Sequence, residues 1–495
     1  MRGLINKIRL YIMYAEKMLL SEYITEIENR GLSASQKENV EKVVTLSEKF
    51  HRDAGIEAGQ RRVDERTVVI ESGHQPNFLP HAGTWKKAFL GDYLSKKIEG
   101  AIFLFGFADQ NLSTAQILSQ SRVPAATKTG SLSIGFKIPE KERWKTFDSI
   151  SKPAPEEFEE EIARLKGHYP EGLGEMEALM RKSYERAKNL ADMNSFIYAN
   201  LCSAWGLSAH FFRYSDVQKA ALFPEGYEKL LSLLPRYNSI YNRVLAEEKI
   251  EDMRPLDMDS APFWLHCPCG GKVQMRLAGG VLFGKCTCGK EHEFAVEQAA
   301  RHIHEMSPAA VSRNIVFAQG LGTSVFLSGA GGGLRYGRIS DAISKEMGLA
   351  LPATIAWKGR DYYLGKTHKA VLKDLARNAG IDSFVDREAV RARIEGRKKE
   401  LAEAIKSSQD KKELQKYQGQ AKTLEVQLAM AEEVFSLVPS FLDELVSLGS
   451  PVVLQAWERM LAGAHVENAD DAYLISRDTV FDAEADKTYA VLAGL

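Results

Sequence analysis

Two short cysteine motifs constrain the fold of this chain more than any other feature of its sequence. Cys-Pro-Cys-Gly at 267–270 and Cys-Thr-Cys-Gly at 286–289 hold four of the five cysteines. Four thiolates at two turns can surround one Zn²⁺ tetrahedrally, and the glycine after each pair lets the backbone turn back toward the sulfurs. Disulfides are the alternative, but nothing else in the sequence indicates an oxidising compartment. We therefore expect a structural zinc ion that stabilises a small β module and does no chemistry, with the ligands Cys267, Cys269, Cys286 and Cys288.

Charge and hydropathy narrow the class of protein. The chain has 65 basic and 66 acidic residues, a balance that argues against broad binding to nucleic acid. Its longest apolar runs fall short of the roughly 18–20 residues that span a bilayer. Residues 1–21 are basic with apolar side chains at helical spacing, and no small-residue cleavage site follows, which favours an amphipathic helix over a secretory signal. We expect a soluble, cytoplasmic protein that binds neither membrane nor nucleic acid.

The segment after residue 66 has the pattern of a parallel sheet. The β-branched run at 67–72 predicts a buried strand, which a turn at 73–83 connects to a helix over 84–98. A second buried strand is expected at 101–105. Strand, loop, helix and strand in this order make a βαβ unit, in which the two strands are parallel.

A second stretch of the same kind follows a long insertion. The insertion is mostly helical, with a strand expected at 209–214, and it ends in the cysteine module. After it the sequence predicts a helix near 307–319, a strand at 323–327, a glycine loop, a helix at 338–347 and a strand at 353–357. We therefore expect one sheet whose two halves are separated along the chain.

Residues 385–437 have a different periodicity. Two apolar seams recur at helical spacing on either side of a polar break at 406–412, and charged residues fill many of the other positions. This pattern is typical of a helical hairpin or coiled coil, which we expect to mediate dimerisation; the alternative is a helix pair packed on the body. The seams are Val390, Ile394, Leu401 and Ile405, and Tyr417, Ala421, Leu424, Leu428, Ala431 and Phe435.

The expected fold is thus α/β, with a Rossmann-like parallel sheet split by insertions, a zinc-ribbon-like β module and a helical coiled-coil domain. The expected segments are an N-terminal helical segment (1–66), the first half of the core (67–150), a helical connecting region (151–261), the zinc module (262–295), the second half of the core (296–384), the coiled-coil hairpin (385–437) and a C-terminal segment (438–495).

Three loops fall at the expected carboxyl ends of strands, where open parallel sheets bind ligands. The segment at 73–87, from the end of a strand to the start of a helix, has histidines and lysines, a setting that suits a polyphosphate or a developing negative charge. The second loop is Asp109-Gln110-Asn111. The third, at 328–336, is rich in glycine, so a ligand can lie against its backbone. Each has a simpler interpretation: His74 could hydrogen-bond a tight turn, and the glycine loop, which lacks the Walker and GxGxxG spacings, could be only a connection. Together they predict a nucleotide or small-molecule site.

At these loops the chain resembles the cysteine-adding enzymes of bacillithiol biosynthesis, the cysteine ligases of that pathway. The family's Gly-Gln-Gln turn corresponds to Gly73-His74-Gln75, and its Gly-Glu-Asp-His-Asp run to 107–111. Its Ser-Pro segment, Arg and Gly-Pro-Gly-Glu-x-x-Tyr-Tyr motif correspond to 307–308, Arg313 and 329–336. The resemblance extends from about residue 35 to the end of the chain. Of the acidic positions in the second motif only Asp109 is kept, Gly332 stands where the family has Glu, and the zinc module is not part of the family pattern.

The resemblance implies a class I synthetase-like core that activates cysteine with ATP or another adenine nucleotide and joins it to the amino group of an amino-sugar conjugate. It also implies a homodimer. The expected catalytic residues are His74, His81, Lys86 and Asp109. The expected nucleotide-binding residues are Gly73, Gly83, Ser328, Gly329, Gly331, Gly332 and Tyr336, and the expected substrate-binding residues are Gln75, Asn111 and Arg313.

Three other functions stay open at this point. The segment at 76–89, PNFLPHAGTWKKAF, resembles a motif of the WbqC-like proteins of glycan biosynthesis. A synthetase relative linked to RNA would use the zinc module and the hairpin to touch nucleic acid, although the sequence has no aromatic-basic motif for it. A non-catalytic dimeric scaffold would explain the lost acidic residues.

Overall fold

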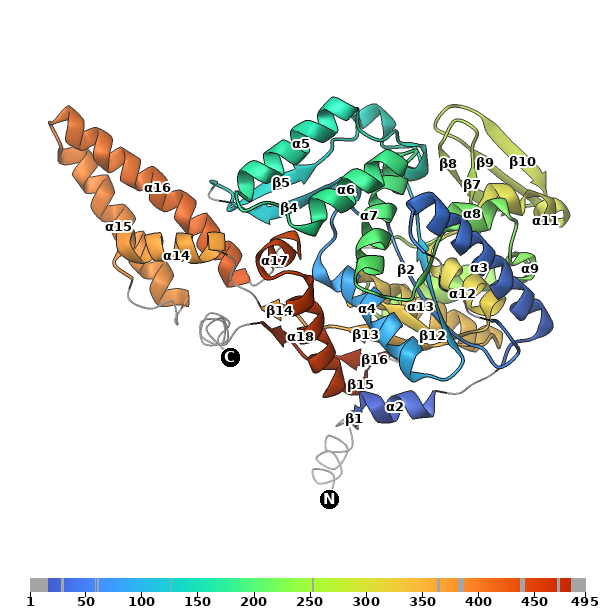
Figure 1. The fold of residues 1–495 in the computed structure, drawn as a ribbon. Coiled ribbons are helices and arrows are strands. Elements are labelled where there is room, and N and C mark those ends of the chain that lie inside the picture. The colour runs from blue at the N-terminus through green and yellow to red at the C-terminus, as the bar shows by residue number, and fades with distance from the viewer. Residues whose placement is uncertain are drawn as a thin grey trace, which may run out of the picture.

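The structure is a computed structural model and describes residues 17–27, 31–57, 59, 62–125, 127–251, 253–362, 366–381, 387–436, 441–469 and 472–481. It is a mixed α/β fold built around one eight-stranded sheet (Figure 1). Every pairing from β16 to β6 is parallel, and β15 and β1 add an antiparallel edge. In spatial order the strands are β1 (Lys17–Leu19), β15 (His465–Ala469), β16 (Ala472–Ile475), β13 (Ala353–Trp357), β12 (Thr323–Ser328), β2 (Val68–His74), β3 (Ala101–Phe107) and β6 (His210–Arg213).

Both faces of this sheet are covered, because its strands carry apolar side chains on both sides. In β2, Val68 and Ile70 belong to one hydrophobic cluster and Val69 belongs to the other. The first cluster includes side chains of α4 (Ala82–Lys97), α7 (Leu190–Ala204) and α18 (Ser450–Ala462). The second includes those of α12 (Ala310–Leu321) and α13 (Gly332–Met347).

The connections reverse direction in the middle of the sheet. From β2 the chain passes through α4 to β3, whereas from β12 it passes through α13 to β13. Since β2 and β12 are neighbours, the chain leaves this pair in opposite directions. That point is the topological switch point, where α/β sheets form a crevice beyond the strand ends.

The strands expected from the sequence are all present, and the sheet is indeed built from both sides of the insertion. The helix over 338–347 is longer than expected, because α13 already begins at Gly332. The antiparallel hairpin of β4 (Gln120–Pro124) and β5 (Ser131–Gly135) was not expected.

The expectation of a helix over residues 1–21 is wrong at its end. Lys17–Leu19 form β1, which pairs with β15, and α2 (Leu20–Glu26) begins only after it. The backbone of β1 extends the edge of the sheet, while Leu20 and Tyr23 enter the core. Residues 1–16 lie outside the described part of the chain.

The remaining helices surround this core. They are α3 (Ala34–Ala54), capped by Ser33, α5 (Pro155–His168), α6 (Glu175–Arg186), α8 (Tyr214–Lys219), α9 (Pro224–Ser232), α10 (Arg236–Glu247), α11 (Ala299–His302), α14 (Lys366–Ala379) and α17 (Phe441–Leu448). Short β14 (Asp361–Tyr362) pairs with β17 (Thr479–Val480).

Cys202 in α7 is fully buried, as its apolar sequence context led us to expect. Within the described residues, no helix combines the length and hydrophobicity that a membrane span requires.

The cysteine motifs occupy two turns of a separate antiparallel sheet. Its strands are β10 (Glu291–Ala295), β9 (Val281–Lys285), β8 (Lys272–Ala278), β7 (Ser260–His266) and β11 (Met306–Pro308), in spatial order. We call the five strands and their turns the cysteine module. The first motif joins β7 to β8, and the second joins β9 to β10. Because β11 leads directly into α12, the module is continuous with the core that carries β12.

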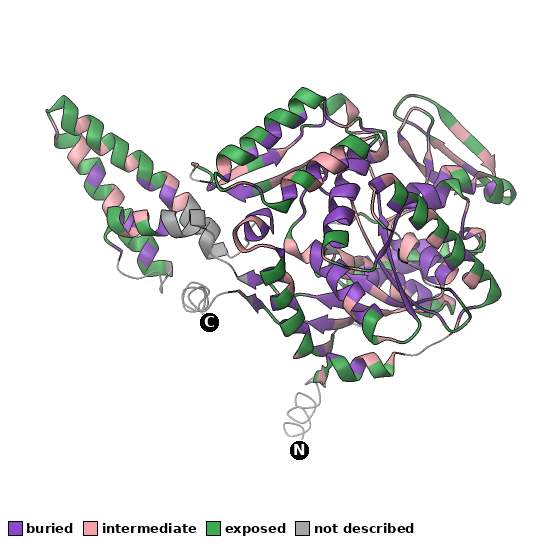
Figure 2. Ribbon diagram, in the orientation of Figure 1, coloured by how far each residue is buried: buried purple, intermediate pink, exposed green. Residues whose placement is uncertain are grey.

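Residues 387–436 form a helical hairpin that projects from the body (Figure 1). Its helices are α15 (Arg387–Ser407) and α16 (Lys411–Ser436). Val390, Ile394 and Leu401 of the first seam are buried together with Leu424 of the second and with Leu375 of α14. The outer faces of both helices are largely exposed (Figure 2). The two seams therefore pack on each other within one chain; the side chains of Ala431 and Phe435 lie outside the described part.

Candidate functional site

A pocket of about 430 Å³ lies beyond the carboxyl ends of β2, β12 and β13, at the topological switch point. All three predicted loops contribute to it. Of the residues expected in the site, the pocket is lined by Gly73, His74, Gln75, His81, Gly83, Asn111, Arg313, Ser328, Gly329, Gly331 and Tyr336. Lys87, Asn314 and Trp357 also line it.

Three expected residues lie outside the lining. Lys86 is fully buried and does not line the pocket; its Nζ lies 2.5 Å from Oδ1 of Asp361 and donates to the carbonyl oxygen of Gly359. Asp109 is buried behind the pocket wall. Gly332 is the first residue of α13 and does not line the pocket, although Gly331 and Gly333 on either side of it do.

Lys87 takes the place in the pocket that we had assigned to Lys86. Its Nζ donates a hydrogen bond of 2.6 Å to the main-chain oxygen of Gly73, at the end of β2. Burial and the nearby guanidinium of Arg313 lower the pKa of Lys87 from 10.5 to about 7. Any anion that enters the pocket would favour the charged form of this side chain.

Arg313 brings a second cation to the pocket from α12. Its guanidinium lies 5.2 Å from the centre of the Tyr214 ring, and no carboxylate of the described residues lies within ion-pair distance of it. Burial raises the pKa of nearby Glu71 to about 7, although Thr323 and Arg313 favour its charged form. The pocket thus has two cations and little compensating negative charge, which suits an anionic ligand.

The two histidines are neutral side chains at the edge of the pocket. Nδ1 of His74 lies 2.8 Å from the carbonyl oxygen of Gln75, and Nε2 lies 3.4 Å from Oγ1 of Thr84. Because a carbonyl only accepts, Nδ1 carries the proton and Nε2 is the acceptor. Burial lowers the pKa of His74 far below 6.5 and also lowers the pKa of His81. The second cause, for both, is the nearby positive charge of Lys87.

The glycine loop places backbone against open space. Gly331 is the N-cap residue of α13, whose first N–H groups have no partners within the helix. A Cβ atom built on Gly329 or Gly331 would meet no atom within 4 Å. A ligand can therefore approach this backbone and the positive end of the helix dipole.

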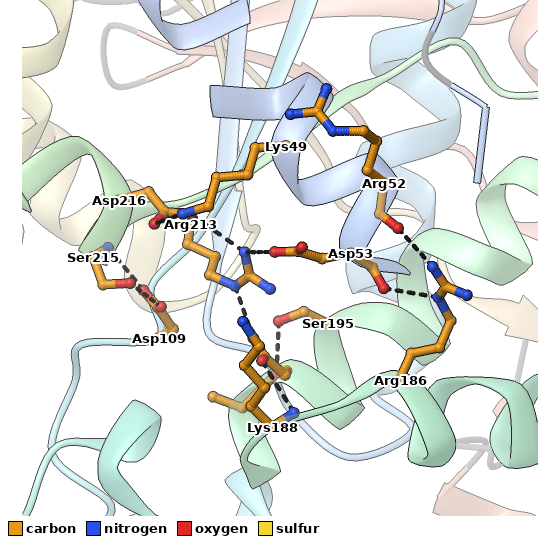
Figure 3. Close-up of polar contacts among 12 residues, drawn as sticks. Lys49, Arg52, Asp53, Asp109, Arg186, Lys188, Ser195, Arg213, Ser215 and Asp216 are labelled. Carbon is orange, nitrogen blue, oxygen red and sulfur yellow. Dashed lines mark hydrogen bonds and ion pairs between the residues drawn. The ribbon is translucent and has the colours of Figure 1, made fainter. Parts of the chain in front are cut away.

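Asp109 holds the second loop in place. Its carboxylate accepts hydrogen bonds from the hydroxyl of Ser215 at 2.5 Å and from the Ser215 N–H at 3.0 Å (Figure 3). Burial, followed by the charge of Asp148, raises the pKa of Asp109 to about 7. Asp109 thus ties the end of β3 to the residues after β6, and its neighbour Asn111 reaches the pocket.

A charged cluster closes the sheet beside this loop, and the sequence analysis missed it. Arg213, the last residue of β6, pairs with Asp53 at 3.1 Å and with Asp216 at 3.3 Å (Figure 3). It also pairs with Asp192, at 2.7 Å. Lys49 also reaches Asp216, at 2.9 Å. These partners come from separate helices, so only their approach in space identifies the cluster.

The four module cysteines form a candidate metal centre. Sγ of Cys267 lies 3.8 Å from that of Cys288, Sγ of Cys269 lies 3.5 Å from that of Cys286, and all four sulfurs lie within 4.8 Å of one another. These separations are far longer than the roughly 2.05 Å of a disulfide. They are close to the roughly 3.8 Å that tetrahedral thiolates around zinc require.

The two cysteine turns have the same backbone geometry. The N–H of Gly270 donates to the carbonyl oxygen of Cys267, and the N–H of Gly289 donates to that of Cys286. Both glycines have a φ near 90°, which favours glycine over other residues. The module therefore presents two equivalent turns that could hold one metal ion, and this arrangement is consistent with zinc.

A second pocket of about 380 Å³ adjoins the first and shares four lining residues with it. Nothing in the sequence indicated it, because its walls come from segments that have no motif in common.

A scan against protein-family models finds no match to this chain, and a search of the curated proteins finds none either.

Proposed function

We propose that this protein is an ATP-dependent ligase that activates the carboxylate of cysteine and joins it to the amino group of an amino-sugar conjugate. The observation that carries this proposal is the pocket at the switch point between β2 and β12, which combines Lys87, Arg313 and the N-terminus of α13. Cations and the N–H groups at a helix N-terminus favour the binding of a triphosphate. On this proposal the sheet is a Rossmann-like core of the class I synthetase type.

The nucleotide would lie across the two strands of the switch point. The adenosine would rest against the glycine loop at 329–331, where the backbone faces open space. The phosphates would extend toward Lys87 and Arg313, with His74 and His81 beside them. Both cations would also stabilise the charge that develops on the α-phosphate during the reaction.

The chemistry would take two steps. A carboxylate oxygen of cysteine attacks the α-phosphorus, and pyrophosphate leaves with the bonding electron pair. The amine of the acceptor then attacks the carbonyl carbon of the cysteinyl adenylate and loses a proton, and AMP leaves. Nε2 of His74 carries no proton, because Nδ1 carries it, and could accept the amine's proton in place of the hydrogen bond from Oγ1 of Thr84.

Two further elements belong to the proposal. The four cysteines would hold a structural zinc ion, because four thiolates leave no open position for a substrate. The hairpin of α15 and α16 would be a coiled coil that mediates a homodimer. Its apolar seams pack within the chain, so a partner would contact the exposed outer faces.

The test is cysteine-dependent exchange of labelled pyrophosphate into ATP, which reports adenylate formation. The parent protein should show exchange, and Lys87→Met should reduce it at least about tenfold, because a charged hydrogen bond to phosphate contributes about 1.5–3 kcal/mol. Lys97→Met is the matched control, since Lys97 is an exposed lysine of the same helix. A parent protein that does not bind ATP in calorimetry, or that shows exchange equally with every amino acid, would refute the proposal.

A further inference from the structure

The second pocket lies directly beside the first. Gln75, Asn111, Ala310 and Tyr336 line both, so molecules bound in the two pockets would be neighbours. At about 380 Å³ the second pocket falls in the range of small-molecule sites, roughly 300–1,000 Å³. We call it the second compartment.

The cysteine module forms one wall of the second compartment. Trp264 of β7 is paired with Gln274 of β8, and both face the compartment together with Lys272, two residues earlier. The alternate residues, such as Leu265 and Val273, are buried in the core cluster. Since neighbouring side chains of a strand point to opposite faces, the β7–β8 pair presents one face to the core and the other to the compartment.

The compartment has two cations near its walls. No carboxylate of the described residues lies within ion-pair distance of Lys272, which is only partly exposed and whose Nζ lies 5.7 Å from the centre of the Trp264 ring. Asp148 and Asp109 lie near enough to favour its charged form, but burial dominates and lowers the pKa of Lys272 to about 7. Arg254 is exposed and also lines the compartment. A ligand with a negative charge would satisfy both.

The rest of the lining suits a ring that carries hydroxyl groups. Aromatic side chains provide flat faces on which a ring can stack, and amide side chains provide donors and acceptors. The aromatic residues are Trp264, Tyr237, Tyr241 and Tyr336, and the amide residues are Gln75, Asn111 and Gln274. The amide of Gln274 is held by the carbonyl oxygen of Ala261 at 2.6 Å, so its position is fixed.

We infer that the second compartment binds the acceptor of the ligase, a small molecule with a hydroxylated ring and a carboxylate or phosphate group, and that the cysteine module is the element that recognises it. This inference rests on the proposed function, because only a two-substrate reaction needs both compartments. It gives the module a role in binding beyond the stabilisation expected from the sequence.

Hydrogen bonds link the first cysteine turn to the wall that both compartments share. The N–H of Thr146 donates to the carbonyl oxygen of Gly270 at 2.7 Å, and the N–H of Phe147 donates to that of Asn111 at 2.8 Å. Residues 146–147 therefore bridge the cysteine turn and the loop that carries Asn111. Loss of the metal should disturb the second compartment before it disturbs the nucleotide pocket.

The experiment measures binding by calorimetry to the metal-loaded protein in the presence of a non-hydrolysable ATP analogue. Glucuronate and glucose 6-phosphate are the anionic ring probes, glucose is the neutral ring, and inorganic phosphate is the anion without a ring. At least one anionic ring should bind about tenfold or more tightly than glucose and phosphate, because it alone satisfies both parts of the compartment. A preference for glucuronate or for glucose 6-phosphate would identify the anionic group.

The variants locate the site. Lys272→Met and Trp264→Leu should each weaken binding of the preferred probe about tenfold and leave the affinity for the ATP analogue within about twofold. Lys285→Met is the control, because Lys285 lies in the same module but pairs with Glu291 on its exposed side, at 3.1 Å. Chelation of the metal should weaken binding of the preferred probe to the same extent as Lys272→Met. Metal content and circular dichroism verify that each variant is folded.

The outcomes separate this inference from the proposed function. Equal binding of all four probes, or equal effects of Lys272→Met and Lys285→Met, overturns the inference while ATP binding stands. A parent protein that binds the anionic ring but no nucleotide refutes the ligase and, with it, the assignment of the compartment to an acceptor.

Discussion

Nζ of Lys87 lies 2.6 Å from the main-chain oxygen of Gly73, which fixes the lysine at the end of β2 inside the candidate nucleotide pocket. The preceding residue, Lys86, is buried on another side of α4 and pairs with Asp361. Successive residues of a helix are about 100° apart, so two adjacent lysines face different surroundings. Their substitution should therefore have different consequences.

Lys86→Met should destabilise the fold, and Lys87→Met should not. The first change leaves the carboxylate of Asp361 buried without its partner, next to fully buried Glu444, which costs about 3–5 kcal/mol. The second removes an ammonium group that burial already disfavours, and should weaken ATP binding about tenfold. Urea denaturation and calorimetry measure the two effects. Equal losses of stability in both variants would contradict the assignment of Lys87 to the pocket.

Nucleotide affinity should fall as the pH rises from 7 to 8.5. The pKa of Lys87 is about 7 in the free protein, so its ammonium form, which a polyphosphate favours, is lost over this range. His74 and His81 do not contribute, because their pKa values are lowered and both are already neutral. At each pH, the nucleotide affinity of the parent is divided by that of Lys87→Met, which cancels the effect of the ionisation of the nucleotide itself. A ratio that does not change with pH would show that Lys87 does not contact the ligand.

The same pKa has the opposite consequence for folding. In the unfolded chain Lys87 keeps a pKa near 10.5, so the unfolded state binds more protons between pH 7 and 10.5. Burial of the charged Lys87 lowers the free energy of unfolding by its full amount below pH 7, and by less and less as the pH rises toward 10.5. The unfolding free energy of the parent should therefore increase relative to that of Lys87→Met over this range. A parallel pH dependence of the two proteins would contradict a buried Lys87.

Gly331→Val should block the nucleotide. A Cβ atom on Gly331 would meet no protein atom within 4 Å, and the valine side chain would extend into the volume assigned to adenosine. Gly337→Val is the control, because Gly337 lies in the same helix, has equally open space and does not line the pocket. We expect ATP affinity to fall at least about tenfold in the first variant only. If both variants bind ATP like the parent, the glycine loop is only a connection.

The sequence predicted the sheet well because its strands are buried on both faces and therefore read as continuous apolar runs. The strand expected at 353–357 has those bounds in the structure. The edge is different: Lys17–Leu19 form a strand only because the distant β15 pairs with them, and no local pattern reports that pairing. The packing of the hairpin seams on each other and on α14 likewise depends on tertiary contacts.

The candidate site was predictable to the extent that it follows strand ends. His74, Arg313 and the glycine loop meet in one pocket, because parallel strands end at the same edge of a sheet. The choice of Lys86 over Lys87 depended on the rotation of one helix, which a sequence does not fix to within one residue. The second compartment was beyond prediction, since Trp264 and Tyr241 come together only when the cysteine module packs on α10.

The cysteine module should bind about one equivalent of zinc per chain and should unfold first when the metal is removed. Four sulfurs within 4.8 Å of one another could hold the turns of β7–β8 and β9–β10 together through one metal ion, and without the metal no bond links the two turns. Elemental analysis of a freshly reduced sample measures the metal. Hydrogen exchange after chelation should then increase at residues 260–295 before it increases in β2 and β3. A metal-free sample with full protection of the module would contradict this role.

Deletion of 387–436 should convert a dimer into a monomer with an intact core. The hairpin projects from the body, and the buried residues of its seams form a hydrophobic cluster with α14 that is separate from the clusters around the large sheet (Figure 1). Its loss should therefore leave the core and ATP binding unchanged. Because the seams are already satisfied within one chain, the dimer contact would use exposed charged residues, and dimerisation should weaken as the salt concentration rises. Light scattering at low and high salt measures both effects, and the sheet is monitored by circular dichroism. A full-length chain that is monomeric at low salt would show that the hairpin serves only its own packing.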